Sequence, residues 1–113
     1  MSIAKQAIEK YDGRVIPFIC TGTVTVGDVV PVGVSMVGVA VNSGLTGEKI
    51  SLEIEKVWTI TAKTTDVIAV GDVVYWDNTA KVVTLTNTNN VYAGRAISAK
   101  AAVAGTIDVK INV

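Results

Sequence analysis

The sequence predicts an all-β protein, a small β-sandwich or barrel built from a duplicated β unit. The first observation is the string VGDVV, which occurs at residues 26–30 and again at residues 70–74. The second is composition: half of the 113 residues are hydrophobic, yet only 5% are aromatic, and β-branched Val and Ile fit a pleated sheet. The third is ten glycines against two prolines, which indicates many tight turns.

The duplication extends beyond the repeated turn. GVAV at 38–41 corresponds to GRAI at 94–97, and the alternating segment after Gly47 corresponds to the one after Gly105. The spacing from the turn to these later elements is longer in the second half, by about the length of residues 77–88. The second copy is therefore predicted to carry an inserted hairpin, within a sandwich or small barrel.

Residues 1–14 are predicted to form an N-terminal arm, and residues 15–113 a single β domain. Within the arm, residues 2–11 are the candidate helix, because their apolar residues fall near helical spacing. A helix this short with few apolar anchors is marginal by itself. An arm that becomes ordered on a partner fits the segment equally well.

Strands are expected from residue 15 onward. Residues 15–20 are apolar, but Pro17 lacks an amide donor, which indicates an edge strand or a strand start. The apolar run 29–41 is divided by Gly33 and Gly38, so it is predicted to form two short strands.

Alternation runs from Ile50 to Ala62 and predicts a strand, with Glu53 and Glu55 on a solvated face. Lys56 falls on the apolar face of this pattern. A β-bulge near Lys56 would reset the alternation, and a subunit contact of this lysine is the alternative.

The second copy contains the turn chemistry expected for its extra hairpin. Residues 73–86 hold two apolar runs around a polar Asp-Asn-Thr loop, which predicts a hairpin. Residues 91–99 and 106–113 are the remaining predicted strand regions.

Little in the chain indicates catalysis. Histidine is absent, which removes the commonest general base and metal ligand, and no Ser-His-Asp or Cys-His arrangement can exist. Cys20 has no disulfide partner and is expected to be a small buried hydrophobe. Asp28 and Asp72 follow Gly27 and Gly71 in the repeated turns, where we expect structural capping of the backbone rather than acid–base work. No catalytic residue, cofactor or metal site is predicted.

Two segments resemble ligand-binding loops in part, but neither has the full pattern of such a loop. Residues 44–51 contain glycines, a lysine and a serine, but Glu48 and Ile50 break the nucleotide-binding order, and the segment leads into a strand. Lys81 lies near a hairpin, as in carrier domains that hold biotin or lipoate, but it lacks the methionine neighbours of those domains.

The net charge and the hydropathy of the chain indicate which classes of partner to expect. Ten basic and ten acidic residues give a formal net charge of zero, which argues against nucleic-acid binding and leaves association with other protein chains plausible. The sequence shows no apolar segment typical of a signal peptide or a membrane span. We therefore expect no membrane partner and synthesis in a cytoplasm.

An ordered set of motifs resembles the small capsid decoration, or head cement, proteins of tailed phages. The set is GDVV, GVAV, TGEKISLEIEKVW, AVGDVVYWD, YAGRAI and GTIDVKINV, and its most specific element is AVGDVVYWD at residues 69–77. The similarity covers about residues 12–113. The family, often labelled recombinase-like, tends to have a glycine where Lys56 precedes Trp58, and residues 1–14 are more arm-like here than the family leads one to expect.

The resemblance implies a non-enzymatic, β-rich protein on the outer surface of an icosahedral virion capsid, made in the host bacterial cytoplasm. Its partner would be the major capsid protein of a tailed phage, and its usual state a homotrimer that stabilises the head by bridging capsid subunits. Our candidate capsid-binding arm comprises Ile3, Ile8, Tyr11, Arg14, Ile16 and Phe18. The alternatives are an accessory protein of phage DNA recombination and a β oligomerisation module of a phage tail.

Overall fold

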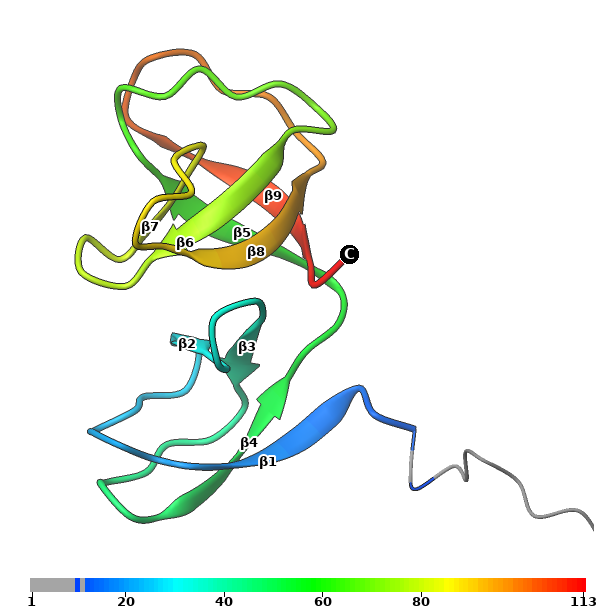
Figure 1. Cartoon of the computed structure of the whole chain (residues 1–113), viewed down its shortest axis with the longest axis vertical. Helices are drawn as coiled ribbons and strands as arrows, with labels where there is room; N and C mark the ends of the chain where they lie inside the picture. The colour runs from blue at the N-terminus through cyan, green and yellow to red at the C-terminus, as the bar shows by residue number, and fades with distance from the viewer. Residues whose placement is uncertain (1–9, 11) are drawn as a thin grey trace, which may run out of the picture.

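The computed structural model describes residues 10 and 12–113, and over these residues the chain is all-β, as predicted. The helix or arm predicted for residues 2–11 lies, except for Lys10, outside the described residues. This part of the chain includes no helix long and apolar enough to cross a membrane. Figure 1 shows two units, one above the other, joined by the segment between β4 and β5. The strands are β1 (Val15–Ile19), β2 (Val29–Pro31), β3 (Val37–Ala40), β4 (Lys49–Glu53), β5 (Val57–Ala62), β6 (Val73–Asp77), β7 (Val82–Thr84), β8 (Val91–Ala96) and β9 (Gly105–Ile111).

The first unit, β1 to β4, is an open four-stranded antiparallel sheet in the order β1-β4-β3-β2, which we call the half-barrel. Side chains alternate between its faces, so the pairs Ile16–Leu52 and Phe18–Ile50 lie on the same inner face. The free thiol of Cys20 is buried there, as predicted. The buried cluster on the inner face consists of Cys20, Val24, Val30, Ala40, Ile50 and Leu52.

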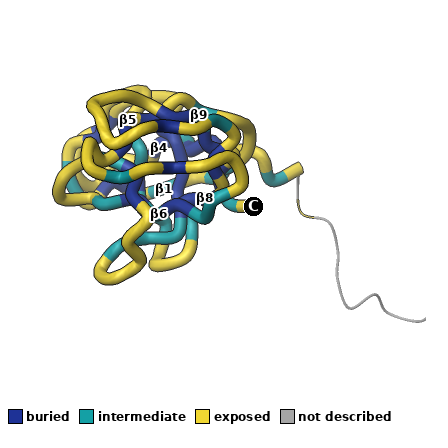
Figure 2. The backbone as a smooth tube through the Cα atoms, turned by 90° about the horizontal axis from the view of Figure 1, so that it is seen from above, coloured by how far each residue is buried: buried dark blue, intermediate teal, exposed yellow. Residues whose placement is uncertain are grey.

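The second unit, β5 to β9, is a closed barrel in the order β5-β7-β6-β8-β9. β9 pairs with β5 along the full length of β5, whereas β7 pairs antiparallel with β6 and meets β5 through the parallel pair Ala62–Val83. Val37 and Val39 of the half-barrel belong to the buried cluster of the barrel, so the two units share a core. In Figure 2 the buried stretches of the chain lie at the centre of the molecule, and exposed loops surround them.

Equivalent hydrogen bonds in the two units confirm the duplication. The amide of Gly27 donates to the carbonyl of Ala40 at 2.8 Å, and the amide of Gly71 donates to the carbonyl of Ala96 at 2.7 Å. Strands β1, β2, β3 and β4 therefore correspond to β5, β6, β8 and β9. The remaining strand, β7, belongs to the inserted hairpin that the spacing predicted, and it closes the barrel between β6 and β5.

The prediction of one bulged strand from Ile50 to Ala62 was wrong. β4 ends at Glu53 and β5 begins at Val57, so the two halves of the alternating pattern belong to different units. Lys56 has φ 83°, a left-handed conformation that turns the chain from the half-barrel into the barrel and that glycine adopts most readily. Glu53 was predicted to lie on a solvated face, but it is only 9% exposed. Its carboxylate forms an ion pair with the Nζ atom of Lys56 at 2.7 Å.

The C-terminal residues hold the two units together. Asn112, which follows β9, accepts a hydrogen bond from the amide of Val37 at 2.9 Å through its Oδ1 atom. Its Nδ2 atom donates to the carbonyls of Val37 at 2.7 Å and Ile54 at 2.8 Å. One side-chain amide thus supplies the backbone partners that Val37 needs at the junction. The C-terminus lies at this junction in Figure 1.

Candidate functional site

The residues predicted to contact a capsid fall partly outside the described chain. Ile3, Ile8 and Tyr11 belong to the residues that the structure does not describe. Arg14 is exposed, and its Nε atom forms an ion pair with Asp12 at 2.8 Å. Because both partners are solvent-exposed, this pair contributes little to stability.

The two candidates within β1 face the chain's own core. Ile16 and Phe18 are half-buried and pack against the cluster inside the half-barrel. The neighbouring Val15 and Ile19 point the other way and are 42% and 55% exposed. The outward apolar side chains of β1 are therefore Val15 and Ile19, which the sequence pattern did not single out.

β1 is an edge strand, as Pro17 predicted. The amide of Cys20 donates to the carbonyl of Glu48, and the amide of Ile54 donates to the carbonyl of Arg14, each at 2.9 Å. Since main-chain groups alternate along a strand, even-numbered residues face β4 and Pro17 faces the free edge. Its missing donor costs no ladder hydrogen bond there, and the edge remains open to another strand.

The two GDVV turns have the same geometry. Gly27 and Gly71 have φ angles of 91° and 92°, which favour glycine. The Oδ2 atoms of Asp28 and Asp72 each accept a hydrogen bond from the amide three residues earlier, at 2.9 Å. Both carboxylates thus hold their own turns.

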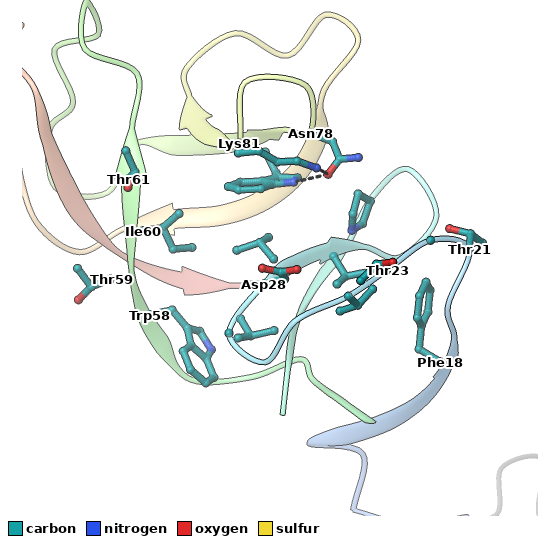
Figure 3. Close-up of a pocket in the computed structure, with 18 residues that line it drawn as sticks. Phe18, Thr21, Thr23, Asp28, Trp58, Thr59, Ile60, Thr61, Asn78 and Lys81 are labelled. Carbon is teal, nitrogen blue, oxygen red and sulfur yellow. Dashed lines mark hydrogen bonds between the residues drawn. The ribbon is translucent and has the colours of Figure 1, made fainter. Parts of the chain in front are cut away.

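A cleft of about 510 Å³ lies between part of the half-barrel and part of the barrel. Its barrel wall comprises residues 58–61 of β5 together with Trp76, Asn78 and Lys81, and its half-barrel wall includes Phe18 and residues 29–31. Figure 3 shows Trp58, Ile60 and Thr61 on one side of the cleft, with Phe18 on the other side and Asp28 between them. The lining is mainly apolar and hydroxyl-bearing, with Asp28 and Lys81 as its charged members.

Lys81 and residues 44–51, the two places that resemble ligand-binding loops in part, have structural roles. Lys81 lies in the loop between β6 and β7, where its Nζ atom donates to Asn78 Oδ1 at 2.9 Å. Residues 44–51 form a turn and the first part of β4, not the start of a helix. Within residues 10 and 12–113, no group of three or more His, Cys, Asp or Glu side chains could hold a metal ion.

Asp66 anchors the strand that closes the barrel, a role that the sequence did not indicate. Its Oδ2 atom accepts hydrogen bonds from Thr84 Oγ1 at 2.6 Å and from the amide of Leu85 at 2.9 Å. Burial raises the pKa of Asp66, but these hydrogen bonds and the charges of Lys63 and Lys100 together lower that pKa below its ordinary value.

Lys100 holds the loop of residues 64–66 from the inside of the protein. The sequence did not indicate this role, because a lysine in an alanine-rich connection is expected to be exposed. It is buried, and its Nζ atom donates to the carbonyls of Thr64, Asp66 and Ala101 at 3.2, 2.9 and 2.8 Å. Three backbone acceptors satisfy all three donors of the ammonium group. The loop that positions Asp66 is thereby fixed.

Replacing Asp66 by asparagine is expected to lower the free energy of unfolding at pH 7 by about 1–2 kcal/mol, because charge-assisted hydrogen bonds to β7 are weakened. A lowered folded-state pKa contributes stability above the unfolded-state value of about 3.9, and this stability is lost as the pH falls through the folded-state pKa. The difference between wild type and D66N should therefore shrink in acid. Urea unfolding at pH 7 and at about pH 3 measures this difference in the free energy of unfolding. D12N, which changes an exposed aspartate, is the control. A difference that is the same at both pH values would contradict this role.

Taken together, the fold and its surfaces define a structural β protein that presents strand edges and apolar surface rather than an array of reactive groups. The chain belongs to the phage cement protein family, whose model matches residues 10–111. Membership of this family indicates a structural role at the phage capsid and a non-enzymatic class of protein. No curated protein and no solved structure gave a significant match to the chain.

Proposed function

We propose that this protein binds the outer surface of an icosahedral phage head and stabilises it by bridging neighbouring subunits of the major capsid protein. The observation that carries the proposal is the family match over residues 10–111. The open edges of the half-barrel support it, because unpaired backbone groups are a ready means of attaching to another protein.

In this proposal residues 1–14 are a capsid-facing arm and residues 15–113 are the folded domain. The arm joins the domain at β1, directly beside the free edge and the exposed side chains of Val15 and Ile19. An arm and an edge that engage different subunits would oppose their separation when the head expands. Ile16 and Phe18 contribute by holding β1 in place, because they pack inward.

A homotrimer on the head is part of the same proposal. Zero net charge removes electrostatic repulsion between copies. Exposed aliphatic side chains gather at the repeated turns of both units, which gives each copy apolar surface for neighbours. These side chains are Val26, Val41 and Leu45 in the first unit and Val67, Val70, Ile97 and Val103 in the second.

Deleting residues 1–12 is expected to abolish binding to undecorated heads while the domain remains folded. The deletion stops before Arg14, whose carbonyl accepts a hydrogen bond from the amide of Ile54 at 2.9 Å and thus completes the pairing of β1. Cosedimentation with purified heads and electron microscopy measure binding, and thermal unfolding checks the fold. Full binding by the shortened protein would show that the arm is not the capsid contact. Failure of the full chain to bind heads would reject the function itself.

A further inference from the structure

Because the two units are copies of one another, the closed barrel shows what is absent from the open side of the half-barrel. In the barrel, β7 lies between β5 and β6 and closes the sheet. The corresponding strands of the half-barrel are β1 and β2, and no strand of the chain from residue 12 onward lies between them. We call the position between β1 and β2 the open slot.

The contacts of β7 show what the open slot is shaped to hold. Val83 is fully buried, pairs with Trp76 on β6 and Ala62 on β5, and accepts a hydrogen bond at its carbonyl from the amide of Lys63 at 2.8 Å. One buried aliphatic side chain, a few backbone hydrogen bonds and the bond from Thr84 to Asp66 hold β7 in the closed barrel.

Strand pairing identifies the corresponding residues of the half-barrel. Phe18 pairs with Ile50 as Ile60 pairs with Ile107, so Phe18 occupies the position of Ile60. By the same register, Cys20 and Thr21 correspond to Ala62 and Lys63. Counted from the glycines of the two GDVV turns, Val32 corresponds to Trp76. The amide of Thr21 is therefore the equivalent of the one that donates to Val83.

The walls of the open slot are partly uncovered. Ile60 and Trp76 are 7% and 4% exposed in the closed barrel, whereas their counterparts Phe18 and Val32 remain only half-buried. The cleft of about 510 Å³ touches Phe18 and Thr21 on the β1 side and Val30 and Pro31 on the β2 side. The cleft therefore reaches both edges that a closing strand would join.

We infer that the open slot accepts an extended segment of a capsid subunit as an added strand, in the position that β7 holds in the barrel. This inference rests on the proposed function and names the surface through which the folded domain performs it. The added strand runs antiparallel to β2 and parallel to β1, and it places a β-branched aliphatic side chain against Cys20 and Val32, the counterparts of Ala62 and Trp76. Its main chain accepts a hydrogen bond from the amide of Thr21.

The chain itself offers no well-suited strand for this position. Every strand of the described residues is already paired within its own unit. The sequence of residues 1–9, MSIAKQAIE, is rich in Ala, Lys, Gln and Glu, which favour helix, whereas β7 is Val-Val-Thr, which favours strand. The occupant is therefore a segment of different sequence from the capsid partner.

A variant that carries its own closing strand tests the inference. Residues 33–35, in the turn between β2 and β3, are replaced by a second copy of residues 77–90, which contain β7. The copied strand then fills the open slot from within the chain. The matched control carries the same insert with aspartate in place of the copied valine of Val83, because a carboxylate is costly to bury in an apolar slot.

Binding to undecorated heads is measured by cosedimentation, and hydrogen exchange reports the amide of Thr21. We expect the closed variant to protect the Thr21 amide and to bind heads at least about tenfold more weakly than wild type, which corresponds to about 1.4 kcal/mol. The control should bind like wild type. A closed variant with a protected Thr21 amide and unchanged binding would overturn the inference while leaving the proposed function standing.

Wild-type protein provides a second measurement if the closed variant does not fold. Exchange at Thr21 and at the free edge of β1 should slow when wild type is bound to heads, and unchanged exchange there would overturn the inference. Protection in free protein that rises with protein concentration would assign the slot to a second copy. Protection in free protein that is lost when residues 1–9 are deleted would assign it to the chain's own arm. Either result overturns the capsid segment as the occupant.

Discussion

Replacing Gly94 by alanine is expected to prevent the barrel from closing and to cost more than about 4 kcal/mol of stability. Gly94 lies in β8, paired with Val74 of β6 on one side and with Ile111 of β9 on the other. Its φ angle of 151° is one that side chains rarely adopt. An added Cβ would lie 2.1 Å from the carbonyl oxygen of Lys110 and 2.9 Å from the Cα of Ile111. Both atoms are backbone of a paired strand, so neither can move aside alone.

Gly38 is the matched control, because it holds the equivalent position in the half-barrel. An added Cβ there would lie 2.8 Å from the Cβ and 3.1 Å from the Cδ1 of Leu52, which are side-chain atoms, and its φ is not left-handed. Overpacking of this kind costs about 1–3 kcal/mol. Urea unfolding followed by circular dichroism should therefore rank G94A as far more damaging than G38A. A loss of less than about 1 kcal/mol for G94A would contradict the close approach of β8 and β9.

Replacing Asn112 by alanine is expected to cost about 3 kcal/mol and to loosen the half-barrel from the barrel. The substitution removes three hydrogen bonds and leaves the amide and carbonyl of Val37, which is 0% exposed, without their side-chain partner. Unpaired buried backbone groups cost about 1–3 kcal/mol each. Native-state hydrogen exchange should show the Val37 amide exchanging faster than the amides of the barrel.

Asparagine also has a backbone role at this position, since its φ angle is 58°. Asn112→Gly separates the two effects, because glycine keeps the left-handed conformation and removes the same hydrogen bonds. We expect the glycine variant to lose most of the stability that the alanine variant loses. A glycine variant as stable as wild type, or an unchanged exchange rate at Val37, would show that the side-chain amide does not hold the units together.

The local elements were predictable because their signals are local. The GDVV turns depend on glycine at a positive φ and an aspartate that caps the preceding amides. The division of residues 29–41 into β2 and β3, and the hairpin of β6 and β7, follow from the glycines and the polar loop between apolar runs. The edge position of β1 follows from the missing donor of Pro17.

The candidate site and the contacts that fix the loops were less predictable, because they depend on how the chain turns and on residues that meet only in the folded structure. Asp66 contacts Thr84, and Lys100 reaches back to the carbonyl of Thr64, pairs that no short pattern reveals. Glu53 continued a regular alternation in the sequence, and only the left-handed turn at Lys56 brought their side chains together as a partly buried ion pair.

The sequence by itself determined that this protein is a duplicated β structure of the phage cement family, because turn chemistry, alternation and the ordered motifs are written along the chain. Only the tertiary structure decided that one copy closes and the other stays open. Closure depends on β7 meeting β5, and opening depends on the first copy having only the short turn 32–36 where the second has the inserted hairpin. Strand pairing between distant segments creates that difference, and it places an uncovered core beside a free edge at the cleft between the two units.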